Sequence, residues 1–316
     1  MNSLIASIPS PSSPAIELGP LTVRYYGLLI GLGVLAAVYI AGKRWNKDDP
    51  KRSIDDASYI AVWGVVGGFI GAKAYHVLTS IPEKGFVDFF LLWEPGLGIP
   101  GGLLVGFLAA WYASKRRGMN FERFMHAAIP GIPVAQAIGR VGNYFNQELF
   151  GRPTDLAWAI EIDQSVRENL ALQAPEFGQF VDSETFHPTF AYEALLNLVL
   201  AGLLVLLDRM GLVKRRMMLP LYVAGYGAIR LVVETFRADE AAVLFGVRFN
   251  GLLAAVAIVV GLGLAIWAHK TAPKFAEEQA TIDLVDEDKG QEPKKKSGKA
   301  QAPRPKKAQA SRSKKR

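Results

Sequence analysis

The segment from Gly139 to Arg152 concentrates side chains that bind anions or transfer protons. It contains two arginines, one glutamate, two asparagines, one glutamine and three glycines, and it follows the apolar residues 127–138. A charged side chain inside a bilayer costs about 2.5–3.5 kcal/mol unless it pairs, faces water or holds a polar ligand. Glycines also let a backbone approach its neighbours closely. The segment therefore indicates either a polar helix end with its following loop or, more specifically, a site for an anionic lipid headgroup.

A second polar set has the spacing of one helix face. Tyr226, Arg230 and Glu234 recur every four residues, and Arg237 follows within one turn. Arg230 and Glu234 can pair, which favours a structural ion pair between helices. The alternative is phosphate recognition, because Arg140 supplies a second guanidinium group and the planar fork of arginine matches phosphate oxygens.

Other polar residues could complete such a site. Asn143 and Asn146 could donate hydrogen bonds to glycerol hydroxyl groups or tie their own loop together. Glu148 and Glu193 could each balance an arginine or act as a general base. His187 is the histidine expected on the outer side of a membrane. The spacing of His, Asp and Glu is not typical of a metal site, so neither a metal nor an organic cofactor is expected.

The apolar pattern predicts an all-α integral membrane protein with about seven transmembrane helices. A spanning helix needs roughly 20 mostly apolar residues, and the third and fourth candidate stretches are short or interrupted by glycine. The candidates are Tyr25–Ala41, Ser58–Leu78, Ile99–Ala113, Phe124–Ile138, Phe190–Leu207, Leu219–Phe236 and Gly251–Trp267. Residues 1–272 are therefore expected to form one membrane domain.

The loops predict how this domain is oriented. Those after the first, third, fifth and seventh stretches are basic, as in Lys43–Lys47 and Lys115–Arg117, whereas the others are not. Because basic loops stay in the cytoplasm, the N-terminus is expected outside and the C-terminus in the cytoplasm. The segment 139–152 then opens outward, beside a small outward-facing loop region at residues 153–186.

The basic excess of the chain lies in its tail. The net charge is +7, but residues 289–316 carry +11, which leaves −4 for residues 1–288. Residues 273–316 contain few large apolar groups and are expected to be a disordered cytoplasmic tail. Such a tail favours an anionic membrane surface, at about 1 kcal/mol per basic residue, and nucleic acid is not expected as a partner. The chain has no cysteine, so a thiol of its own cannot be a nucleophile.

These motifs carry a resemblance to a known family. The segment Gly139–Arg152 is similar to the prolipoprotein diacylglyceryl transferase signature, Gly-Arg-[Leu/Ile/Val]-Gly-Asn-[Phe/Tyr]-x-Asn-x-Glu-x-[Trp/Phe]-Gly-Arg. Flanking motifs occur in the same order: Tyr25-Tyr26-Gly27, His187-Pro188 with Tyr192-Glu193, and Gly225-Tyr226-Gly227 with Arg230, Glu234 and Arg237. The resemblance covers roughly Pro20 to Trp267.

The resemblance implies a reaction in the bacterial plasma (inner) membrane. The sn-1,2-diacylglyceryl group of phosphatidylglycerol would pass to the lipobox cysteine thiol in the signal peptide of a preprolipoprotein, and glycerol phosphate would leave. It implies that Arg140 and Arg230 hold the phosphate and stabilise charge that develops on the leaving group. Further catalytic or substrate-binding positions are expected at Tyr26, Asn143, Asn146, Glu148, Gly151, Tyr226, Glu234 and Arg237.

One position departs from the family. Many members have His-Gly-Gly where this chain reads Pro100-Gly101-Gly102, and that histidine has been assigned as general base, whereas proline cannot accept a proton. Gly101 and Gly102 could still present backbone N–H groups to an anion, although a packing corner is the commoner use. A thiol with a pKa of about 8.5 needs modest help to ionise, so the hypothesis is that His187 or Glu148 accepts its proton.

Other classes of function remain open on the sequence. A transporter or a lipid-binding membrane protein could use the same arginines to hold an anionic solute or headgroup, but the two halves of the chain show no convincing repeat of the kind common in transporters. A lipid phosphatase or phosphotransferase would normally bring a nucleophile or a metal cluster, and neither is visible.

Overall fold

The computed structural model describes residues 7–80, 98–238, 243–244 and 247–271. Within them the chain is mainly helical, and six helices exceed sixteen residues. These long helices are α1 (Tyr25–Asp48), α2 (Ile54–Thr79), α3 (Ile99–Arg116), α7 (Thr189–Arg209), α8 (Met218–Glu234) and α9 (Phe249–Thr271). The predicted tail, residues 273–316, lies outside the described residues.

Five segments are long and apolar enough to cross a membrane. Four of them are the helices α1, α2, α7 and α9. The fifth is α8 together with the 3-10 turn η3 (Arg215–Met217) that precedes it. The helix α3 covers the third predicted stretch but does not meet the same criterion. The prediction of an all-α membrane protein therefore agrees with the structure, whereas five rather than seven spans meet the criterion within the described ranges.

The fourth predicted stretch is not one helix. The chain forms α4 (Phe121–Ala128) and α5 (Gly131–Phe145), with Ile129 and Pro130 between them. Proline has no backbone N–H and its ring clashes with the preceding turn, which ends α4 at this point. The apolar pattern alone missed the break, and α5 by itself is too short to cross a bilayer of ordinary thickness.

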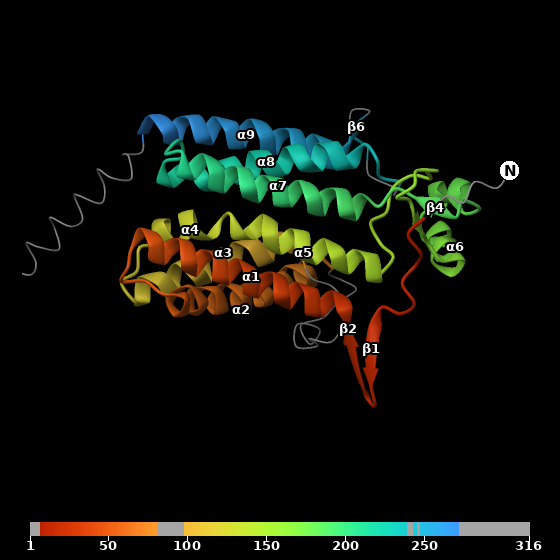
Figure 1. Ribbon diagram of the computed structural model, residues 1–316, viewed down its shortest axis with the longest axis horizontal. Coiled ribbons are helices and arrows are strands. Elements are labelled where there is room, and N and C mark those ends of the chain that lie inside the picture. The colour runs from red at the N-terminus through yellow and green to blue at the C-terminus, as the bar shows by residue number, and fades with distance from the viewer. Residues whose placement is uncertain (1–6, 81–97, 239–242, 245–246, 272–316) are drawn as a thin grey trace, which may run out of the picture. The chain divides into compact units, whose positions relative to one another are not determined.

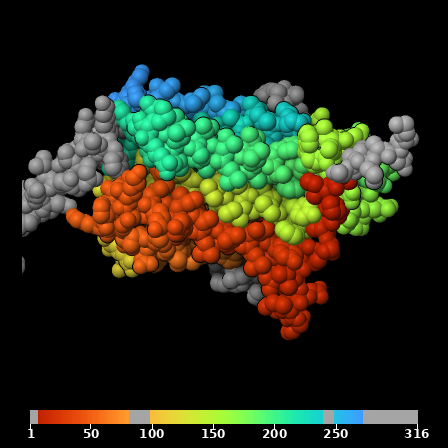
Figure 2. Space-filling view, in the orientation of Figure 1, coloured from red at the N-terminus to blue at the C-terminus, as the bar shows by residue number. Residues whose placement is uncertain are grey.

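The helices pack in a set of neighbouring pairs. Figure 1 shows α7, α8 and α9 on one side and α1 to α5 on the other, and the closest pairs are α2 with α3, α8 with α9, α1 with α5 and α5 with α7. Figure 2 shows α5 side chains between those of α1 and α7 on one face. The two sides meet through α5 with α7 and through α4 with α8 and η3. Figure 1 shows α6 (Gln164–Gln173) and β4 (Thr185–Phe186) at one end of the bundle.

The surface of the long helices is apolar. Large side chains such as Leu35, Leu103 and Val259 are exposed, whereas small residues such as Gly33 and Ala57 are buried between helices. This pattern is typical of membrane helices, which approach one another through small residues and turn large apolar side chains toward lipid.

The described residues outside the long helices form small sheets, and those of the predicted loop region enclose an apolar cluster. The strands form antiparallel pairs: β1 (Ala15–Leu18) with β2 (Leu21–Arg24), β3 (Ile160–Glu161) with β4, and β5 (Val243–Leu244) with β6 (Val247–Arg248). The predicted loop region 153–186 also holds α6 and the 3-10 turn η2 (Pro175–Phe180). Its interior is formed by Phe150, Ile160, Ile162, Phe177, Phe186 and Phe190. Tyr144 in the last turn of α5 packs against this apolar cluster, so the region lies beside the polar segment 139–152.

Candidate active site

Three helices converge on the carboxylate of Glu193. Arg140 on α5 donates through Nη2 to Glu193 Oε1 at 2.6 Å, and Nη1 of Arg230 on α8 lies 3.7 Å from Glu193 Oε2. The hydroxyl of Tyr226, one turn before Arg230, donates to Glu193 Oε1 at 3.0 Å. Glu193 therefore balances both arginines, which is one of the two roles that the sequence allowed.

A second buried carboxylate extends this cluster. Arg230 Nη2 donates to Glu234 Oε2 at 3.0 Å, and Arg248 Nε donates to Glu234 Oε1 at 2.8 Å. The predicted pairing of Arg230 with Glu234 is therefore present. Three arginines and two glutamates take part in the cluster, and the cluster carries a net positive charge if all five groups are ionised.

The burial of these groups is uneven. The side chains of Glu193 and Glu234 are 2% and 5% exposed, whereas those of Arg140 and Arg230 are 22% and 20% exposed. The two carboxylates are thus almost inaccessible, whereas about a fifth of each arginine side chain is accessible. An arrangement of this kind can bind an anion such as a phosphate, because each arginine has five donors and uses only some of them on the carboxylates.

The loop after α5 is tied to the same cluster. Asn143 Nδ2 and Asn146 Nδ2 both donate to Glu148 Oε1, at 2.8 and 3.0 Å. Arg140 Nη1 lies 3.4 Å from Asn143 Oδ1, so a chain of polar contacts runs from Arg140 to Glu148. Asn143 is buried and Glu148 is exposed. The two asparagines therefore tie the loop together. Glu148 is the exposed acid at the end of this series of polar contacts.

The backbone of the signature segment needs special geometry after α5 ends. Gln147 and Leu149 have positive φ angles of 51° and 56°, which non-glycine residues rarely adopt. The side chain of Gln147 offsets this cost with two hydrogen bonds to Asp163. Its Nε2 donates to Asp163 Oδ2 at 2.6 Å, and its Oε1 accepts from the backbone N–H of Asp163 at 2.8 Å. Thr189 at the start of α7 donates to the Leu149 carbonyl.

Two glycines of the segment are required by close packing. A Cβ on Gly142 would lie 2.6 Å from Cδ2 of Tyr26, which places Tyr26 directly against α5. A Cβ on Gly151 would lie 2.6 Å from the carbonyl oxygen of Phe236 and 2.8 Å from Cβ of His187. Gly151 also pairs through its backbone with Arg237, a buried residue. The segment is thus clamped between the ends of α1, α7 and α8.

His187 lies in an aromatic environment. Its Nδ1 is 3.0 Å from the hydroxyl of Tyr192, which also accepts a hydrogen bond from Trp158 Nε1 at 2.9 Å. The ring centroid of Phe236 is 5.3 Å away. Burial lowers the pKa of His187 below its usual value, so the ring is neutral near pH 7. Among the described residues, the hydrogen bond of its ring goes to Tyr192 rather than to the arginine cluster.

The glycines at the entry to α3 have a packing role. A Cβ on Gly101 would overlap the carbonyl oxygen of Gly71, and one on Gly102 would lie 3.2 Å from Cβ of Ala72. Pro100 stands in the first turn of α3, where its missing N–H is tolerated. The structure thus brings together the two arginines, Tyr226, Glu234, Asn143 and Asn146. Gly101 and Gly102 instead contact α2.

Some polar residues near the cluster belong to no motif in the sequence. Arg248 precedes α9 and has no regular spacing from Glu234, so nothing in the pattern pointed to their contact. One helical turn from Arg140 and Glu193, on the side away from the loop, lie Gln136 and Asn197. Asn197 is fully buried, and within the described ranges neither Oδ1 nor Nδ2 has a hydrogen-bond partner; Gln136 Oε1 also lacks one. Their i±4 spacing from Arg140 and Glu193 was the available signal.

No group of three or more His, Cys, Asp or Glu residues that could hold a metal ion occurs among the described residues. The prediction that no metal or cofactor takes part remains a prediction. The arginines of the cluster can bind an anion, and Glu148 and the neutral His187 are groups that can accept a proton.

Comparison with known proteins agrees with the motifs. The family model described as prolipoprotein diacylglyceryl transferase matches residues 13–267. Relatives named phosphatidylglycerol–prolipoprotein diacylglyceryl transferase include one from Streptomyces griseus, 38% identical over 93% of this chain and 86% of the relative. Those of Frankia alni and Corynebacterium diphtheriae are each 40% identical, over 89% and 82% of this chain and 73% and 93% of the relatives.

Proposed function

Because the chain belongs to the prolipoprotein diacylglyceryl transferase family, we propose that it transfers the sn-1,2-diacylglyceryl group of phosphatidylglycerol to the lipobox cysteine thiol of preprolipoproteins. This is the first step of bacterial lipoprotein maturation, and glycerol phosphate is the second product. The observation that carries the proposal is the pair of partly exposed arginines, Arg140 and Arg230, above the buried carboxylate of Glu193.

The donor phosphate binds to N–H groups of Arg140 and Arg230 that the carboxylates leave unused. Both arginines already contact Glu193, so they are held in place before the lipid arrives and lose little freedom on binding. Tyr226 and Glu234 act on the arginines rather than on the lipid, because their hydrogen bonds go to Glu193 and Arg230. The glycerol headgroup then lies toward Asn143 in the last turn of α5 and Asn146 directly after it.

The reaction is a substitution at the sn-3 carbon of the diacylglyceryl group, which carries the phosphate ester. The thiolate sulfur attacks this carbon, a C–S bond forms, and the C–O bond to the phosphate breaks with its electron pair on oxygen. The charge that develops on the leaving phosphate falls on Arg140 and Arg230. Removing one such donor typically costs 10²- to 10³-fold in rate, or about 2.7–4 kcal/mol.

Glu148 is the proposed acceptor of the thiol proton. Its carboxylate is exposed, and it is linked through Asn143 to Arg140. His187 can also take a proton, but its ring bonds to Tyr192 in the aromatic environment. We therefore expect Glu148→Gln to lower turnover more than His187→Ala. Retained turnover in the doubly substituted protein would exclude both residues as the base.

The proposed setting is the bacterial plasma membrane with seven crossings. The five apolar helices support the membrane location, and α3 together with the broken pair α4 and α5 would supply the third and fourth crossings. The basic loops support an outer N-terminus and a cytoplasmic C-terminal tail at residues 273–316. The arginine cluster then opens near the outer surface, where a secreted lipobox peptide can reach it.

The test uses purified full-length protein with phosphatidylglycerol and a synthetic lipobox peptide. A peptide mass gain of one diacylglyceryl group, with an equal amount of glycerol phosphate released, is expected. The gain should disappear with a Cys→Ser peptide, because the thiol is the acceptor, and with phosphatidylcholine as the lipid donor. No mass gain from folded protein that still binds phosphatidylglycerol would instead favour a lipid-binding role.

A further inference from the structure

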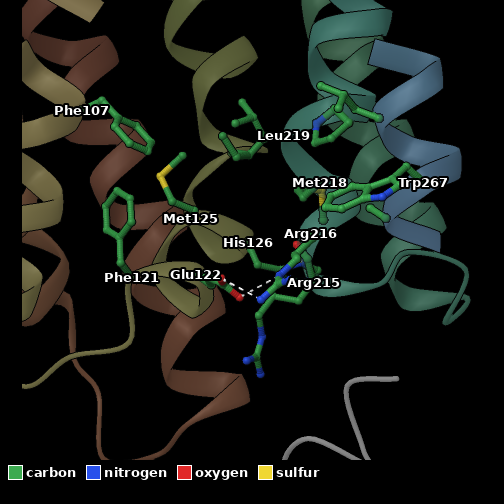
Figure 3. Close-up of a pocket in the computed structure, with 14 residues that line it drawn as sticks. Phe107, Phe121, Glu122, Met125, His126, Arg215, Arg216, Met218, Leu219 and Trp267 are labelled. Carbon is green, nitrogen blue, oxygen red and sulfur yellow. Dashed lines mark hydrogen bonds and ion pairs between the residues drawn. The ribbon is translucent and has the colours of Figure 1, made fainter. Parts of the chain in front are cut away.

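An apolar cavity lies far from the arginine cluster along the helices. It has a volume of about 290 Å³ and lies between α3, α4, η3, α8 and α9 (Figure 3). Its walls are mostly apolar side chains, among them Phe107, Met125, Leu219 and Leu264. Roughly 16 Å of helix separates Leu219 from Arg230 at 1.5 Å per residue. The cavity is therefore a separate feature, near the end of the bundle that the proposed orientation assigns to the cytoplasm.

Charged groups stand at one end of this cavity. Arg216 on η3 contacts Glu122 on α4 through both Nε and Nη2, each at 3.2 Å, as Figure 3 shows. The two side chains are 52% and 50% exposed, so their ion pair is a surface pair that stabilises the fold only weakly. A ligand with a phosphate group can therefore replace Glu122 as the partner of Arg216. Arg215 also lines this end of the cavity.

The volume and position of the cavity fit one hydrocarbon chain. Phe107 lies roughly 13 Å along α3 from the end of that helix at Arg116, which is close to half of a hydrocarbon core of about 30 Å. A chain that enters beside Arg216 would thus remain within one leaflet. The volume is at the lower limit of small-molecule sites, which suits a single chain better than a whole lipid.

We propose that this cavity binds one acyl chain of an anionic phospholipid from the cytoplasmic leaflet, with the lipid phosphate on Arg216. The apolar walls take the chain and the guanidinium group selects the anionic headgroup. The donor lipid held by Arg140 and Arg230 cannot fill this site, because its phosphate would be at the opposite surface. The inference rests on the proposed orientation of the bundle but not on the transfer reaction.

The test counts phospholipids bound to purified full-length protein by native mass spectrometry after incubation with phosphatidylglycerol. Two retained lipids are expected, one at the arginine cluster and one in the apolar cavity. Leu264→Trp should fill the cavity and leave one lipid. Its control is Leu262→Trp: both leucines are on α9 and 48% exposed, but Leu262 does not line the cavity. The control should retain two lipids, and two lipids on Leu264→Trp would overturn the proposal.

A second pair of variants tests the headgroup contact. Arg216→Ala should lower occupancy of the second lipid at least fivefold, whereas Arg209→Ala, an exposed arginine at the end of α7 outside the cavity, should not. Equal retention of the second lipid with phosphatidylcholine, or by Arg216→Ala, would contradict binding of an anionic headgroup. Leu264→Trp should transfer diacylglyceryl groups at the rate of Leu262→Trp. The lipid count therefore tests the second site, and the transfer rate separately tests the proposed function.

Discussion

Replacing Glu193 by glutamine tests what holds the two arginines in place. The substitution keeps the side-chain volume but removes the charge that Arg140 contacts at 2.6 Å and Arg230 at 3.7 Å. Breaking a fully buried ion pair by removing one partner costs about 3–5 kcal/mol. Here about a fifth of each arginine side chain is accessible, and water screens part of the unpaired charge. We therefore expect a loss of stability of about 1–3 kcal/mol.

We expect a loss of similar size in transition-state stabilisation, because the arginines would no longer be held in position for the phosphate. A change of 1–3 kcal/mol in transition-state stabilisation corresponds to a decrease of roughly 5- to 150-fold in kcat/KM. The assay is peptide modification over a series of phosphatidylglycerol concentrations, together with thermal unfolding in the same detergent. Since Glu193 is proposed to position the arginines and not to carry a proton, the shape of the pH–rate profile should not change.

A matched control is Glu176→Gln, which removes an exposed carboxylate of the loop region and should leave both measurements unchanged. Wild-type stability and activity in Glu193→Gln would refute the reasoning, because the carboxylate would then not hold the arginines. Loss of one limb of the pH–rate profile would refute it differently, since Glu193 would then act as an acid or base.

Three further substitutions make separate predictions. Gly151→Ala should destabilise the protein by about 1–3 kcal/mol, because its Cβ would lie 2.6 Å from the Phe236 carbonyl oxygen; Gly178→Ala, with open space, is the control in thermal unfolding. Asn197→Leu should raise the unfolding temperature, because it removes a buried amide without a partner in the described residues, and a lower temperature would reveal a partner. The lowered pKa of His187 means that wild-type stability falls as pH drops through about 6.5, and His187→Gln should reduce this dependence in pH-dependent melting curves.

Much of the candidate site was predictable because its chemistry is local in sequence. Arg230 and Glu234 are four residues apart on one helix, so their ion pair follows from helical spacing. The signature segment brought Arg140, Asn143 and Glu148 together for the same reason. The role of Glu193 could be stated only as one of two alternatives, because its partners lie on two other helices.

The remaining features depend on tertiary contacts that no short pattern contains. Arg248 reaches Glu234 across a connection between helices, and its position depends on how α8 and α9 pack. The break between α4 and α5 was hidden because apolar residues continue on both sides of Pro130. The apolar cluster of the loop region was missed because its phenylalanines, such as Phe150 and Phe186, are far apart in the sequence.

The most direct test of phosphate binding by the two arginines is the rate of peptide modification by Arg140→Ala and Arg230→Ala. Each variant should lose at least 10²-fold in the rate of diacylglyceryl transfer, the usual effect of removing a donor to a developing anion. Arg140→Lys should recover only part of this loss, because lysine keeps the charge but lacks the planar fork. Transfer by both alanine variants within tenfold of the wild-type rate, with the protein folded, would contradict a role for these arginines in binding the phosphate.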